Sequence, residues 1–189
     1  MLGECGTNKA MNRPHARKTK PPLDATRLNE LALTYVGRFA TSRAKLATYL
    51  HRKIRERGWV GDQSADVDAL VQRISDLGYV DDKAYALSKA QSLTGRGYGE
   101  RRVGQALWVA GISDADGGDA RDLASAEALD SALRFARRRR IGPFGDGPVD
   151  PAKRERSIAA MIRAGHSFNL ARRIVELEPG VEPDWENFI

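Results

Sequence analysis

Arginine and lysine side chains supply most of the chemistry that this sequence offers. They recur in three groups along the chain, each in or near an expected helix. Guanidinium and ammonium groups hold phosphate and carboxylate groups through charge-assisted hydrogen bonds. In corresponding positions of stacked helices they would form one positive stripe for a polyanionic partner. The alternative is that they are solvated, as on many helix faces. The residues are Arg43, Arg52, Lys53 and Arg55; Arg96, Arg101 and Arg102; and Arg137, Arg138, Arg139 and Arg140 with Lys153, Arg154 and Arg156.

A glycine-rich turn, Gly95-Arg96-Gly97-Tyr98-Gly99, lies in the middle of this basic set. It superficially resembles a phosphate-binding loop, but it follows an expected helix instead of a strand and lacks the Lys-Ser/Thr ending. A nucleotide site is therefore not predicted here. Free backbone N–H groups and guanidinium groups at a helix start can nevertheless hold a phosphate or a carboxylate.

Catalytic groupings are not evident in the sequence. His15, His51 and His166 are far apart and lack a carboxylate pattern, so each is predicted to be a surface or capping histidine. Asp81 and Asp82 could be paired carboxylates for metal or acid–base chemistry, but a helix cap accounts for both more simply. We therefore predict a protein that is not an enzyme and that uses no metal or cofactor.

The composition favours a helical, water-exposed protein with an anionic partner. Of the 189 residues, 41% are hydrophobic and 30% are charged, with a net charge of +6 and a pI near 9.7. Such an excess favours polyanions without distinguishing nucleic acid from acidic protein. Cys5 is the single cysteine, so no intrachain disulfide is possible. No apolar run is long enough to cross a membrane, and we expect a cytoplasmic protein.

The stretch from Leu77 to Ala86 predicts a tight corner between two helices. Gly78 can adopt the left-handed conformation that closes a helix, and Tyr79 can pack back onto the last turn. Asp81 can cap the next helix, and Asp82 suits the positive end of its dipole. The helix that ends at this corner has an apolar face consisting of Val67, Leu70, Val71, Ile74 and Leu77.

Aromatic and glycine residues return at nearly constant intervals. If the chain is divided into three units of three helices, Tyr35, Tyr85 and Phe135 each lie early in the first helix of a unit. A glycine ends the second helix of each unit. This spacing predicts an all-α fold of three tandem three-helix repeats, stacked into an elongated, curved array. The glycines are Gly58, Gly111 and Gly165, and the predicted divisions are a disordered basic tail at 1–23, repeats at 24–80, 81–126 and 127–178, and an acidic tail at 179–189 in which Trp185 and Phe188 could dock.

Three stretches resemble the RecX family of regulatory proteins. The corner from Gly78 to Ala86 is similar to the family signature, and Gly97 to Val103, with Leu107 and Gly111-Ile112, resembles its second-repeat pattern. Ser42-Arg43 through Leu46 is similar to the first-repeat pattern. The sequence departs from the family at Lys45 and Ala106, where an acidic residue is frequent, and in the glycine- and proline-rich loop at 141–151.

The resemblance implies a bacterial modulator of the RecA recombinase in DNA repair, recombination and the SOS response. Family members are tandem three-helix repeats that bind the RecA filament, mostly limiting its growth, ATPase and strand exchange, and they also bind DNA. We accordingly expect a monomer whose partners are the RecA nucleoprotein filament and, more weakly, DNA. The alternative is a helical-repeat protein that binds DNA directly, without a recombinase partner. Translation could start at Met1 or at Met11. Six residues are assigned a structural role in the family pattern and no role in binding. They are Gly78, Tyr79, Asp81, Asp82, Tyr85 and Gly111.

Overall fold

Helices form the regular structure in the part of the chain that the computed structural model describes, residues 20–147, 150–181, 183 and 188. Nine α helices and a 3₁₀ turn lie in these residues, which contain no β strand, and the predicted all-α fold is confirmed. The helices are α1 Ala25–Val36, α2 Arg43–Arg57, α3 Val67–Asp76, α4 Asp82–Gly95, α5 Glu100–Val109, α6 Gly118–Ala126, α7 Ala128–Arg139, α8 Pro151–Arg163 and α9 Phe168–Val175, with the 3₁₀ turn at Gly142–Phe144.

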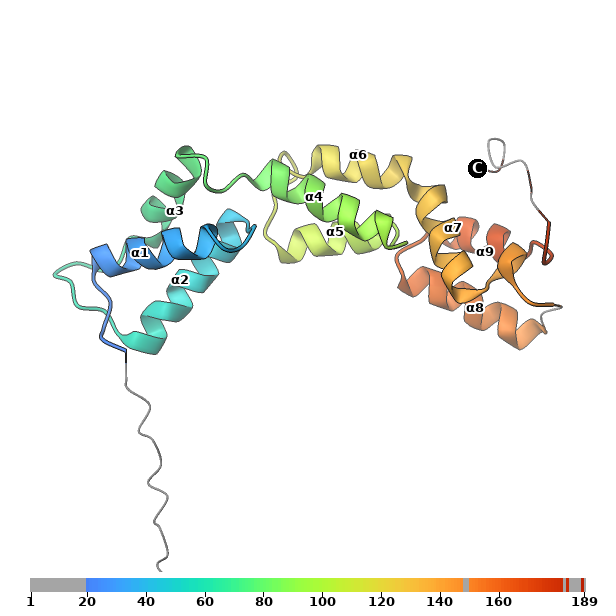
Figure 1. The fold of residues 1–189 in the computed structure, drawn as a ribbon, viewed down its shortest axis with the longest axis horizontal. Helices are drawn as coiled ribbons and strands as arrows, with labels where there is room; N and C mark the ends of the chain where they lie inside the picture. Colours follow the sequence, from blue (N-terminus) through green and yellow to red (C-terminus); the bar gives the residue numbers. More distant parts are fainter. Residues whose placement is uncertain (1–19, 148–149, 182, 184–187, 189) are drawn as a thin grey trace, which may run out of the picture.

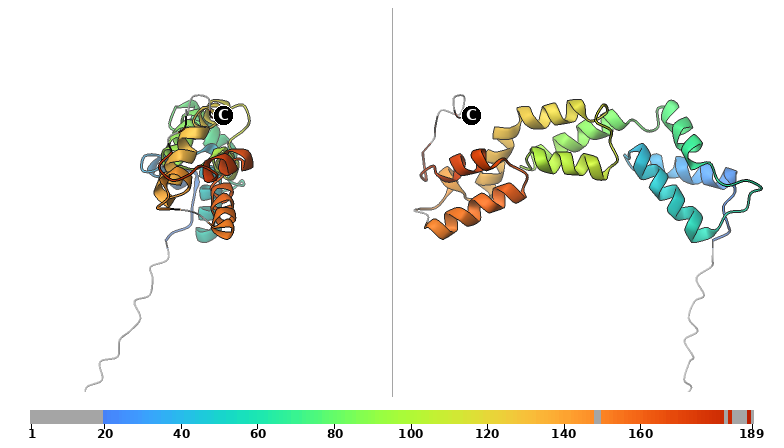
Figure 2. Two further views of the ribbon diagram at one scale, coloured as in Figure 1. Left: turned by 90° about the vertical axis from the view of Figure 1, so that its right-hand side faces the viewer. Right: turned by 180° about the vertical axis from the view of Figure 1, so that it is seen from behind.

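The helices fall into three consecutive groups, and each group encloses its own hydrophobic core. We call α1–α3 the first bundle, α4–α6 the second and α7–α9 the third. Figure 1 shows them following one another in a long, arched row, which is narrow when seen end-on in Figure 2. The shape agrees with the predicted elongated, curved array. That the bundles are copies of one unit with the predicted boundaries stays a prediction.

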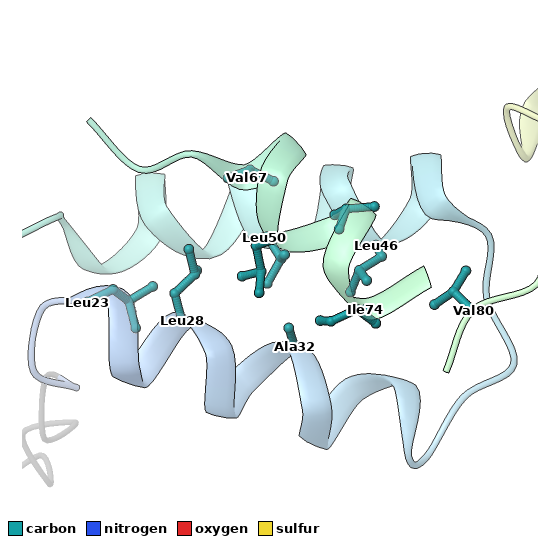
Figure 3. Close-up of a cluster of buried hydrophobic side chains, with 10 residues drawn as sticks. Leu23, Leu28, Ala32, Leu46, Leu50, Val67, Ile74 and Val80 are labelled. Carbon is teal, nitrogen blue, oxygen red and sulfur yellow. The ribbon is translucent and has the colours of Figure 1, made fainter. Parts of the chain in front are cut away.

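The core of the first bundle is aliphatic and draws on all three helices (Figure 3). Leu28 of α1, Leu46 and Leu50 of α2, and Ile74 of α3 lie together and are at most 3% exposed. Burial of such a side chain stabilises the fold by roughly 1.5–3 kcal/mol. The bundle is therefore held by packing. Leu77, which is predicted to lie on the same apolar face, caps the end of α3 and is exposed instead.

Leu23 also belongs to this core, although the sequence places it in the basic tail. Its side chain is fully buried. Its N–H donates to the carbonyl of Gly58 (2.9 Å), and its own carbonyl accepts from the N–H of Val60 (2.8 Å). The expected tail boundary is wrong at this residue, because backbone pairing with the chain that follows α2 draws Leu23 inside.

The second helices α2, α5 and α8 meet end to end along the row (Figure 1). At the first junction, Ser42 at the start of α2 donates from Oγ to the carbonyl of Ala110 at the end of α5. At the second junction, the N–H of Gly99 before α5 donates to the carbonyl of Ala164 after α8 (3.0 Å). Helix ends leave N–H and C=O groups unpaired within the helix. At each junction, a hydrogen-bond donor at the start of one helix therefore pairs with a carbonyl at the end of the next.

The second and third bundles are also joined by an almost unbroken helix. Glu127 ends α6 and immediately precedes α7. At the far end, Phe188 is buried in the third core, and the Arg173 guanidinium lies 4.5 Å from its ring centroid. The prediction that Phe188 docks on the last bundle is confirmed, while Trp185 lies outside the described residues. Within those residues, no helix is long and apolar enough to cross a membrane.

Candidate functional site

The predicted corner between α3 and α4 forms with the expected backbone. Gly78 has φ of 76°, and the N–H of Tyr79 donates to the carbonyl of Ile74 (3.1 Å), which closes α3 in the manner of a Schellman motif. Asp81 caps α4 by accepting from the N–H of Ala84 (2.9 Å), as predicted. Tyr79 is 59% exposed, so most of its surface is not packed back onto α3 as expected.

Asp82 has a role that the sequence interpretation missed. The sequence predicts a place for it at the helix cap and dipole, but it is buried and binds the first bundle. Its Oδ1 accepts from the backbone N–H of Arg43 (2.9 Å) and its Oδ2 from Arg43 Nε (3.0 Å). Asp116 accepts from Nη2 of the same guanidinium (2.9 Å). The hydrogen bond and the negative charge of Asp82 raise the pKa of Arg43. Its contacts with Asp82 and Asp116 cross from the first to the second bundle and give this arginine a structural role at the junction.

Two further contacts complete the first junction. Lys45 Nζ donates to the hydroxyl of Tyr85 (2.7 Å). Gly111, with φ of 68°, lies so close to Ala44 that an added Cβ would come within 2.4 Å of the alanine Cβ. The structural motif residues Asp82, Tyr85 and Gly111 therefore join two bundles, which explains their types without any chemical activity.

Four of the predicted contact residues lie at or beside the second junction. The guanidinium carbons of Arg96 and Arg102 lie 5.4 and 5.9 Å from the ring centroid of Tyr98. Arg138 Nη1, from the third bundle, donates to the carbonyl of Arg96 (2.7 Å). The Arg101 side chain is exposed beside them at the start of α5. We call Arg96, Arg101, Arg102 and Arg138 with Tyr98 the junction cluster; its arginines remain exposed and can bind anions.

Backbone contacts hold this cluster in place. A Cβ added to Gly97 would lie 2.9 Å from the backbone nitrogen of Phe135, and one added to Gly99 would lie 2.5 Å from the carbonyl carbon of Gly165. The backbones of the second and third bundles are therefore too close for side chains at these points. The glycine-rich turn is a packing element between bundles instead of a phosphate loop.

His166 lies in the same contact and is not a surface or capping histidine, contrary to the sequence interpretation. It is 2% exposed, and its Nε2 lies 3.1 Å from the carbonyl of Gly97. Since a carbonyl only accepts, Nε2 carries the proton in this contact. Burial lowers the pKa of His166, and the hydrogen bond to Gly97 opposes this to a smaller extent. His51 is exposed, as expected, and His15 lies outside the described residues.

The remaining predicted contact residues form separate local groups. In the first bundle, Arg52 and Lys53 both lie within 5.8 Å of the ring centroid of Tyr49 and both pair with Glu56, while Arg55 is exposed. In the third bundle, Arg137 lies over Phe144, Arg139 over Phe135, and Arg140 pairs with Asp146 (3.0 Å). Lys153, Arg154 and Arg156 are exposed on the first turns of α8. A single continuous stripe stays a prediction; Arg43 has an internal role instead.

Two open cavities lie away from the junction cluster. An open cavity of about 560 Å³ lies beside Trp59 and α3, and another of about 490 Å³ lies between the first two bundles beside Tyr79 and Tyr85. No histidine or cysteine of the described chain lines either one. Among the residues with assigned positions, no group of three or more His, Cys, Asp or Glu could hold a metal ion.

Comparison with known proteins places the chain in a family. No family model matches it. A Myxococcus xanthus (strain DK1622) protein named regulatory protein RecX is 32% identical over 187 residues, which cover 91% of this chain and 99% of the relative. This chain belongs to the RecX family. A second regulatory protein RecX, from Xanthomonas campestris pv. campestris (strain B100), is 31% identical over 65% of this chain and 72% of its own length.

Solved RecX structures share the fold of this chain. RecX from Lactobacillus salivarius superimposes with a TM-score of 0.58 at 18% identity, covering 80% of this chain and 94% of its own. A second structure, described as regulatory protein RecX, gives a TM-score of 0.57 at 18% identity over 79% of this chain and 70% of its own. The RecX resemblance predicted from the corner and from the first- and second-repeat patterns is therefore confirmed at the level of family and fold.

Proposed function

We propose that this RecX-family chain binds the RecA recombinase filament and limits its growth, its ATP hydrolysis and its strand exchange during DNA repair and recombination. The observation that carries the proposal is family membership over nearly the full length of a regulatory protein RecX. The chain acts as a regulator and not as an enzyme, in the bacterial cytoplasm and as a monomer.

The shape and the charge of the molecule support this proposal. Three bundles in an arched row present a long outer surface, which suits contact with several subunits of a filament (Figure 1). The junction cluster adds exposed guanidinium groups in the middle of the row. Guanidinium groups bind carboxylate and phosphate alike, so the cluster suits an acidic protein surface or the DNA that the filament encloses.

The direct test is a titration of this protein into RecA filaments on single-stranded DNA, using RecA of the same organism and following ATP hydrolysis. We expect hydrolysis to fall as the protein is added, at concentrations where naked DNA of the same length is barely bound. Addition before and after filament assembly separates an effect on growth from an effect on the assembled filament. Unchanged hydrolysis under both orders of addition would falsify the proposal.

A second candidate function is direct binding to DNA without a recombinase partner. It is favoured by the half-buried Tyr98 ring, which lies near the guanidinium groups of Arg96 and Arg102 and so places an aromatic side chain beside phosphate-binding groups. Binding of naked DNA by this route falls steeply with salt, because bound arginines release counterions. If the affinity for naked DNA accounts for the whole concentration dependence of inhibition, this second function is the correct one.

A further inference from the structure

Gly104 is a glycine that the fold of this chain does not require. It lies in the interior of α5, where glycine weakens a helix relative to alanine. Its backbone has no positive φ, and a Cβ added to it would meet nothing within 4 Å. Gly97 and Gly111 differ in both respects, since they have positive φ and lie against a neighbouring bundle. No contact within the described chain explains the choice of glycine at position 104.

The residues around Gly104 form an unusual exposed face. Arg101, Gly104, Gln105 and Trp108 are three or four positions apart and so lie along one side of α5. Val103 and Leu107 lie on the opposite, fully buried side. Trp108 is 79% exposed, although a side chain of this kind is normally largely buried. Since nothing lies within 4 Å of the added Cβ, the Trp108 ring does not cover Gly104, and the space beside it is open.

The electrostatic setting of this face is positive. Arg101 is exposed, and no ion pair to it is found in the part of the chain that the structure describes. Arg102 Nη1 donates to Gln105 Oε1 (3.2 Å), which keeps that guanidinium beside the same face. The face thus continues from the junction cluster along α5 to Trp108, and a negatively charged occupant is complementary to it.

We propose that the face of α5 formed by Arg101, Gly104, Gln105 and Trp108 is a docking surface for an acidic protein segment. The segment comes close to the α5 backbone at Gly104, is covered by the Trp108 ring, and places carboxylates on Arg101 and Arg102. Tryptophan and arginine are the side chains that most often dominate binding energy in protein interfaces. Phosphates and stacked bases would use the arginines and the ring, but they do not need the missing side chain.

This inference rests on the proposed function, in which the partner is the RecA filament, and it assigns the protein-contacting surface. Its test uses the full chain with Gly104→Gln, Gly104→Ala and Trp108→Ala. Both glycine replacements are expected to raise the melting temperature, because glutamine and alanine are better helix formers. Gly104→Gln and Trp108→Ala are nevertheless expected to raise the concentration for half-inhibition of RecA at least about tenfold. For Gly104→Gln, a role confined to folding cannot weaken binding while stability increases.

The same variants are measured for binding to naked single-stranded DNA, and for direct binding to RecA filaments by anisotropy of the labelled protein. Phe168→Ala is the matched control, since it removes another exposed aromatic ring, in the third bundle. We expect DNA affinity to stay within about twofold of the parent for the uncharged substitutions, because they remove no phosphate contact.

The outcomes separate this inference from the proposed function. Variants that inhibit and bind like the parent show that this face is only solvated, and the inference fails while the proposed function stands. A parallel loss of affinity for naked DNA identifies the occupant as nucleic acid and also overturns it. A parent protein that binds no filament refutes the proposed function, and the inference falls with it.

Discussion

Arg43 donates two hydrogen bonds to Asp82, one from its backbone N–H (2.9 Å) and one from Nε (3.0 Å), across 39 positions of the sequence. The carboxylate thereby completes the first turn of α2 from another bundle and holds the guanidinium that also reaches Asp116. In the sequence, Arg43 looks like a contact residue and Asp82 like a helix cap. In the structure, the two residues together form part of the junction between the first and second bundles.

Replacement of Asp82 is therefore expected to cost more stability than replacement of its neighbour Asp81. Asp82→Ala removes the partner of a charged group and of a backbone N–H, a loss of about 1.5–3 kcal/mol. Asp81→Ala removes a helix cap only, at about 1 kcal/mol. Urea unfolding of both variants measures the difference. Equal losses would show that Asp82 contributes only through the first turn of α4.

Gly111→Ala is expected to destabilise the first junction through two separate effects. The added Cβ collides with Ala44, and φ of 68° strains any side chain. Gly78→Ala is the matched control, because its φ of 76° carries similar strain while the space around it is open. We expect Gly111→Ala to lose at least about 1 kcal/mol more than Gly78→Ala.

Ala44→Gly should recover the excess loss in the Gly111→Ala background, since it removes the colliding methyl group. The measurement is a double-mutant cycle by urea unfolding. If Ala44→Gly has the same effect with and without Gly111→Ala, the two residues are not in contact and the assigned junction is wrong.

His166 predicts a decrease in stability on acidification. Its pKa in the folded protein is lowered, mainly by burial, so between the folded and unfolded pKa values the unfolded state binds more protons. The stability that neutral His166 contributes is present above the unfolded value, about 6.5, and is lost as the pH falls toward the folded value. The melting temperature of the parent should therefore fall between about pH 7.5 and pH 5.5.

His166→Gln should reduce this pH dependence, because glutamine can donate to the Gly97 carbonyl and does not titrate. The stability difference between parent and variant should be largest near neutral pH and shrink on acidification. His51→Gln, at an exposed position, serves as the control and should keep the slope of the parent. A parent slope retained in His166→Gln would assign the pH dependence to other groups.

The double variant Arg101→Glu with Arg102→Glu tests the junction cluster. Both residues lie in the first turn of α5, where a negative charge is favourable to the helix dipole, so we expect folding stability to change by no more than about 0.5 kcal/mol. Inhibition of RecA should fall, and the salt dependence of DNA binding should flatten. Melting temperature, ATP hydrolysis and DNA affinity at two salt concentrations are the measurements.

Arg154→Glu with Arg156→Glu, at exposed positions of α8, gives a comparison of equal charge change. A larger effect of the Arg101 and Arg102 pair would assign the contact to the junction cluster. Equal effects would indicate that only the net charge of the molecule matters, as expected for a solvated face.

The sequence alone determined the helical class, the family and the corner between α3 and α4. These properties are local. Asp24, Ser42, Asp66, Asp81, Asp150 and Ser167 each accept a hydrogen bond from the first turn of the helix that follows, and such caps act within three residues. The apolar spacing of α3 likewise identified Val67, Leu70, Val71 and Ile74 as core residues.

The tertiary structure decided which of these residues join the bundles. Asp82 and His166 have side chains that look like a cap and a surface group in the sequence, because their partners, Arg43 and Gly97, are remote along the chain. Leu23 looks like part of a tail in the sequence for the same reason, since its partners Gly58 and Val60 are remote along the chain. Charge and periodicity report which face of a helix is apolar, whereas the position of a neighbouring helix end depends on how all three cores pack. Because α2, α5 and α8 meet end to end, some basic residues lie in the junctions between bundles, and the others stay exposed to a partner.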